Sequence, residues 1–128
     1  MGFLLASSLN QALAWPWSPA TPEVRETPLE RPELAQLRLA AGWQPESPQV
    51  LIVDVGNRLS GPVICRSLSV QRKDDTQASL PLQPPLYVPV GATRRVSVPG
   101  VSKSQMKQWG LSCNCFKQAP GRACEAAP

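Results

Sequence analysis

The sequence has no histidine, only 5% aromatic residues and no long apolar run. Histidine is the commonest general base and metal ligand in proteins, so its absence excludes Ser-His-Asp and Cys-His catalysis within this chain. The sequence also contains no glycine-rich phosphate-binding loop and no dinucleotide-binding fingerprint. We therefore expect a non-enzymatic protein that binds no cofactor.

A transmembrane helix needs roughly 20 apolar residues, and no stretch of the chain approaches that length. Residues 1–14 contain a short apolar stretch that ends in Ala-Leu-Ala, the small-x-small pattern of a signal-peptidase site. We expect cleavage before Trp15, although no Lys or Arg precedes the apolar stretch. The alternative is an amphipathic first helix with three leucines on one face (Leu5, Leu9 and Leu13). A signal peptide predicts a periplasmic or extracellular protein.

Proline is abundant, with 15 residues in the chain against a usual share of roughly 5%. Proline fixes φ and removes a backbone donor, so it interrupts helices and central strands. Residues 15–31 contain four prolines and are typical of an extended linker or arm. Trp15 and Trp17 lie in this arm, and they either pack on their own domain or bind a partner. We take both as candidate partner-binding residues, acting by strand addition or by docking in a groove.

Two short helices are expected. A capping box that begins at Thr27, with proline at the first helical position, predicts a helix over residues 28–41 that ends at Gly42. A second capping box that begins at Ser102 predicts one or two helical turns over residues 102–110.

From residue 49 onward the pattern changes to short apolar stretches separated by Gly and Pro turns. The expected strands cover residues 49–55, 63–70, 86–90, 93–100 and 111–117. Three prolines confine the third of these to a sheet edge or a bulge (Pro84, Pro85 and Pro89). This spacing predicts a mainly β domain over residues 32–128, a small antiparallel β-sandwich or a partly open barrel.

The four cysteines allow three interpretations. Cys113 and Cys115 are one residue apart, so in a strand they share a face. Zinc prefers Cys-x2-Cys pairs or added histidines, and a disulfide between Cys113 and Cys115 would be strained. An even number of cysteines in a small chain with an export signal favours two structural disulfides. Of the three possible connectivities we favour Cys65–Cys113 with Cys115–Cys124; the alternative is a metal-binding or thiol-redox protein built on the same residues.

The charge is uneven: residues 1–48 carry a net charge of −2 and residues 49–128 carry +6. Arg94 and Arg95 could contact phosphates, but the basic region offers only Tyr87 and Phe116 for base stacking, so we expect no nucleic acid as partner. Together these features predict an exported, non-enzymatic β domain. Its expected role is to bind another protein or to act as a structural subunit of an envelope or extracellular complex.

Overall fold

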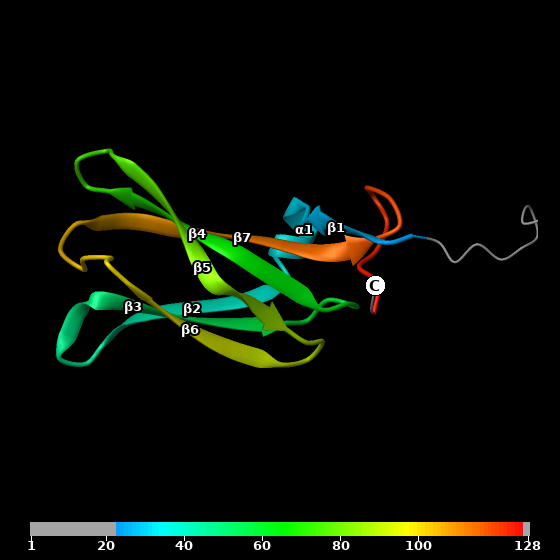
Figure 1. Ribbon diagram of the computed structural model, residues 1–128, viewed down its shortest axis with the longest axis horizontal. Coiled ribbons are helices and arrows are strands. Elements are labelled where there is room, and N and C mark those ends of the chain that lie inside the picture. Colours follow the sequence, from blue (N-terminus) through cyan, green and yellow to red (C-terminus); the bar gives the residue numbers. More distant parts are fainter. Residues whose placement is uncertain (1–22, 127–128) are drawn as a thin grey trace, which may run out of the picture.

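The computed structural model describes residues 23–126. The elements in chain order are β1 (Arg25–Pro28), α1 (Arg31–Leu34), β2 (Leu37–Gln44), β3 (Ser47–Asn57), β4 (Val63–Arg72), β5 (Gln77–Val88), β6 (Thr93–Pro99) and β7 (Met106–Lys117). All pairings are antiparallel, in one sheet of order β1-β7-β4-β5 and a second of order β2-β3-β6. The two sheets lie face to face (Figure 1). The prediction of a mainly β antiparallel fold is confirmed, and the sheets do not close into a barrel.

The core lies between the two sheets. On β3, Leu51, Val53 and Val55 are fully buried and point inward, while Ile52 and Asp54 between them face outward and are half-buried. This alternation follows from the two-residue period of a strand. The opposite sheet contributes further buried residues from its two central strands and from β5 (Val63, Cys65, Leu68, Val70, Leu82, Val88, Cys113 and Cys115).

A bulge in β4 brings Cys65 into this core. Simple alternation would place Cys65 and Leu68 on opposite faces, yet both are fully buried. The pairing of β4 with both β5 and β7 shifts register between Cys65 and Ser67. One extra residue in the strand reverses the phase of the side chains, so both residues face inward.

The helices differ from those expected. The capping box forms between Glu30 and Glu33, and α1 ends at Leu34 instead of continuing to residue 41. From Leu37 the chain pairs with β3, because the ladder and the burial of Leu37 favour a strand there. The second helix, expected over residues 102–110, is absent: residues 102–105 form a turn, and β7 starts at Met106. No helix in the described part of the chain is long and apolar enough to cross a membrane.

The described end of the segment expected as a linker over residues 15–31 contains a strand. Arg25–Pro28 forms β1 at the edge of the first sheet, where it pairs with β7. Leu29 follows it, is buried and donates its backbone N–H to the carbonyl of Cys113 at 3.1 Å. These contacts add a strand to the domain from a segment whose prolines suggested a linker. The predicted signal peptide (1–14), Trp15 and Trp17 lie outside the described residues.

Candidate functional site

The cysteines form two disulfides, Cys65–Cys113 and Cys115–Cys124, which is the pairing favoured from the sequence. Cys65 and Cys113 are directly opposed on β4 and β7, and their Cα atoms lie 3.9 Å apart. All four side chains are buried, and none of the cysteines is free. A thiolate is the species that binds metals and attacks disulfides. With all four cysteines oxidised, no thiolate is present to bind a metal or to attack a disulfide.

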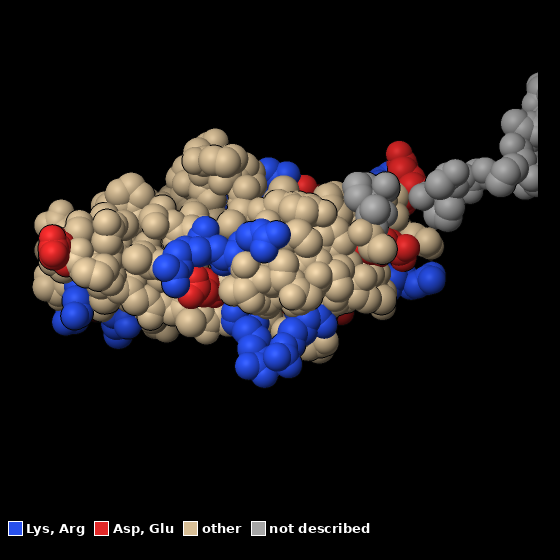
Figure 2. Space-filling model, turned by 90° about the horizontal axis from the view of Figure 1, so that it is seen from below, with Lys and Arg blue, Asp and Glu red and all other residues tan. Residues whose placement is uncertain are grey.

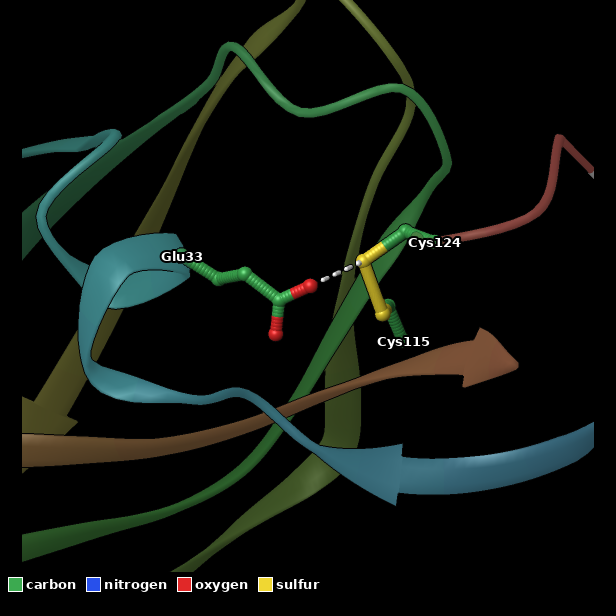
Figure 3. Close-up of side chains that lie close together, drawn as sticks. All are labelled: Glu33, Cys115 and Cys124. Atoms are coloured by element: carbon green, nitrogen blue, oxygen red, sulfur yellow. Dashed lines mark hydrogen bonds between the residues drawn. A yellow bond between two sulfur atoms is a disulfide. The ribbon is translucent and has the colours of Figure 1, made fainter. Parts of the chain in front are cut away.

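A buried lysine beside the second disulfide holds three segments together. Lys117 is fully buried, and its Nζ lies 2.7 Å from Glu33 Oε1 and 3.7 Å from Glu30 Oε2. The other oxygen of Glu33 lies 3.6 Å from Cys124 Sγ (Figure 3). Glu33 and the two sulfurs are as close as the ligands of a metal site, but the sulfurs are bonded to each other and the carboxylate pairs with Lys117. The cluster therefore anchors α1 and the C-terminal segment to β7.

A second ion pair holds β1 in place. Arg66 on β4 donates two hydrogen bonds to the carboxylate of Glu26, at 2.6 and 2.7 Å, and Asn114 Nδ2 donates a third at 2.6 Å. The hydrogen bond from Arg66 is the main cause that lowers the pKa of Glu26 from 4.5 to about 2. The ionised carboxylate is thus the form that secures β1.

We predict that acid weakens this attachment. The pKa of Glu26 is lower in the folded than in the unfolded chain, so its stabilisation is complete above pH 4.5 and is lost as the pH falls toward 2. Glu26→Gln should lower the free energy of unfolding by about 1 kcal/mol at neutral pH and flatten its acid dependence. Urea unfolding across this pH range measures both effects. Asp75→Asn removes the same charge from an exposed turn and should keep the wild-type pH profile; a Glu26→Gln profile as steep as wild type would refute the prediction.

The edges of the two sheets differ in how well they are protected against pairing with another strand. Exposed edges are usually guarded by shortness, proline, bulges or charge. β1 has four residues; β5 contains three prolines and bulges at residues 82–85; β6 carries Arg94 and Arg95, ends at Pro99 and faces β5 across a groove. Among the described edge strands, β2 is the least guarded: it pairs regularly with β3 from Leu37 to Trp43, contains no proline or lysine and carries a single charged residue, Arg38.

The backbone of β2 has free hydrogen-bonding groups on this edge. On the β6 side of the sheet, Asn57 on β3 donates its backbone N–H to the carbonyl of Ala92 and accepts from the N–H of Gly91, and the carbonyl of Gln49 accepts from the N–H of Gly100. Because the two sides alternate along a strand, the even-numbered residues of β3 bond to β2. Their partners on β2 are Arg38, Ala40 and Gly42. Leu39 and Ala41 therefore present their N–H and C=O groups to the open edge.

The inward-facing side chains of β2 are also incompletely covered. Leu39 and Ala41 lie opposite the fully buried Val55 and Val53, so they point between the sheets. Leu39 nevertheless stays 41% exposed, and Ala41 is exposed as well. An added strand would thus satisfy backbone groups and cover apolar side chains at once.

The outward face of the same sheet carries a hollow lined by arginine. A concavity of about 860 Å³ follows the chain from Ala35 to Ala40 and is bounded by Asp54, Arg58 and Thr93. Arg38, Gly56 and Thr93 form one row across the three strands. Gly56 lines an adjoining concavity together with Arg38, Arg58 and Thr93. A side chain at Gly56 would bring its Cβ to 3.2 Å from both Arg38 Cβ and Thr93 Oγ1, so glycine avoids crowding these two side chains. We call Arg38, Arg58, Gly56 and Thr93, which line these two concavities, the arginine hollow.

Positive charge dominates this face. Figure 2 looks onto the β2-β3-β6 sheet and shows Lys and Arg side chains gathered across its middle. Arg95 donates hydrogen bonds of 2.8 and 3.1 Å to Asp54, and this contact lowers the pKa of Asp54. Within residues 23–126, neither Arg38 nor Arg58 has a carboxylate within ion-pair distance. Both guanidinium groups are exposed and available to an anion.

Comparison with protein-family models, with curated proteins and with solved structures finds no significant match. Of the residues singled out in the sequence, the four cysteines come together in pairs, whereas Trp15 and Trp17 lie outside the described residues and their role stays a prediction. The open edge was missed because residues 28–41 were expected to be helical.

Proposed function

We propose that the protein is an exported, non-enzymatic domain that binds another protein by accepting one of its segments as an added strand along β2. The observation that carries the proposal is the β2 edge, where free backbone groups and uncovered apolar side chains coincide. Strand addition draws affinity from main-chain hydrogen bonds and specificity from alternate side chains.

The rest of the domain supports this role. Two buried disulfides are consistent with an oxidising, exported location. They join β4 to β7 and the C-terminal segment to β7, away from β2. A rigid scaffold lowers the entropic cost of binding because the accepting edge is already formed. The thiol-based alternative, a metal or redox protein, would require these bonds to be reduced.

Site-specific crosslinking in the cell of origin tests the proposal. A photoreactive amino acid is placed at Ala40 on β2 and, as a matched control, at Ser97 on β6; both residues are exposed, face outward and lie on edge strands of the same sheet. We expect one defined protein to be crosslinked through Ala40 and not through Ser97. Equal crosslinking from both positions, or none from Ala40, would overturn the proposal.

A further inference from the structure

We infer that the segment accepted by β2 is acidic: an extended stretch of another protein with carboxylates at alternate positions and apolar side chains between them. The inference rests on the proposed function and specifies the chemistry of its partner. Side chains of a strand added to β2 would lie in two rows, one beside the outward Arg38, Ala40 and Gly42, the other beside the inward Leu39 and Ala41.

The two rows meet different surroundings. The outward row passes along the arginine hollow, where Arg38 and Arg58 have no carboxylate partner among the described residues and Asp54 is already paired with Arg95. A carboxylate in this row would find two exposed guanidinium groups, whereas a lysine would be repelled. The inward row lies beside Leu39, whose 41% exposure leaves an apolar surface to cover. A segment that alternates acidic and apolar side chains matches both rows.

Two other occupants fit less well. A second copy pairing through its own β2 would continue the sheet and bring two arginine-bearing faces together, which like-charge repulsion disfavours. The chain's own residues 15–22 contain Pro16, Pro19 and Pro22. Proline has no N–H to donate to a ladder, so this segment is a poor added strand. Charge complementarity therefore points to an acidic segment of a different protein.

Binding of fluorescent peptides to the intact oxidised protein tests the inference. One octapeptide alternates valine and glutamate between terminal serines, and its counterpart carries lysine in place of glutamate. Fluorescence anisotropy should show the glutamate peptide binding at least about tenfold more tightly, with a difference that shrinks at high salt. Arg38→Gln and Arg58→Gln should each weaken its binding by about two- to fivefold. Arg122→Gln, an exposed arginine on the C-terminal loop, should leave binding unchanged.

The possible failures are distinguishable. If both peptides bind equally and the Ala40 crosslink is found, strand addition stands and the acidic preference is wrong. If neither peptide binds, or if both arginine variants bind as wild type, the inference is overturned whatever the crosslink shows. If the protein self-associates and a blocked β2 prevents it, the occupant is a second copy and the acidic segment is wrong. Arg58 lies in a loop, so its variant remains informative even if Arg38→Gln fails to fold.

Discussion

Replacing Cys65 by serine is expected to lower the free energy of unfolding by about 4 kcal/mol, whereas Cys124→Ser should lower it by about 2.5 kcal/mol. The Cys65–Cys113 bond joins residues 48 apart and the Cys115–Cys124 bond joins residues 9 apart. A longer closed loop removes more entropy from the unfolded chain, so its loss is more damaging. Cys65 is also fully buried on a central strand, where the serine hydroxyl would face the remaining thiol of Cys113.

Denaturant unfolding of both variants without reductant, with free thiols counted, measures this difference. Each variant should contain one free thiol, on Cys113 in Cys65→Ser and on Cys115 in Cys124→Ser, and mapping the labelled cysteine shows whether the remaining disulfide has kept its pairing. A Cys124→Ser variant as unstable as Cys65→Ser would contradict the assignment of Cys65–Cys113 as the main covalent support of the sandwich. A chelator that unfolds the wild type would instead revive the metal-binding alternative.

The second large effect is expected at the buried ion pair. Glu33→Gln leaves Lys117 fully buried, and among residues 23–126 only the half-exposed Glu30, at 3.7 Å, remains to balance its charge. Removing one partner of a buried ion pair leaves the other charge unpaired in a poorly solvating interior. We therefore expect Glu33→Gln to lower the free energy of unfolding by about 3 kcal/mol. The exposed Glu23→Gln removes the same charge and should change stability by less than about 0.5 kcal/mol.

A double variant distinguishes the cost of an unpaired buried charge from the cost of replacing Glu33 itself. Lys117→Met combined with Glu33→Gln removes the charge that the single variant leaves unpaired, so it should recover much of the lost stability. Thermal or urea unfolding of the wild type, the two single variants and the double variant gives the comparison. If Glu33→Gln is no worse than Glu23→Gln, Lys117 does not depend on Glu33 and the anchoring role of the cluster is wrong.

The sequence predicted the fold class and the disulfides because both depend on local, repeated signals. Alternating and β-branched residues identified the strands from residue 49 onward, and the even cysteine count favoured two bonds. Lys117 was missed, although a signal was present. Cys113, Cys115 and Lys117 follow the two-residue period of β7, and all three are buried on one face.

The open β2 edge could not be predicted from short stretches of sequence, and the reason is physical. Leu37 and Ala41 fit the apolar stripe of a helix, and Leu37, Leu39, Ala41 and Trp43 fit the alternation of a strand equally well. Pairing with β3 decides between helix and strand, because β3 forms a ladder of backbone hydrogen bonds with this segment. Which strand remains at an edge depends on the order of the whole sheet, and no single stretch of sequence contains that order.

Proline substitutions on the two edge strands of the β2-β3-β6 sheet test most directly whether a partner strand adds to β2. Ala41→Pro and Ser97→Pro each remove an N–H that points away from the sheet, so both variants should fold with the wild-type circular dichroism spectrum. The measurement is the affinity of each folded variant for the protein crosslinked through Ala40. We expect Ala41→Pro to weaken binding by at least about tenfold and Ser97→Pro to bind as wild type. Undiminished binding by Ala41→Pro would contradict strand addition along β2.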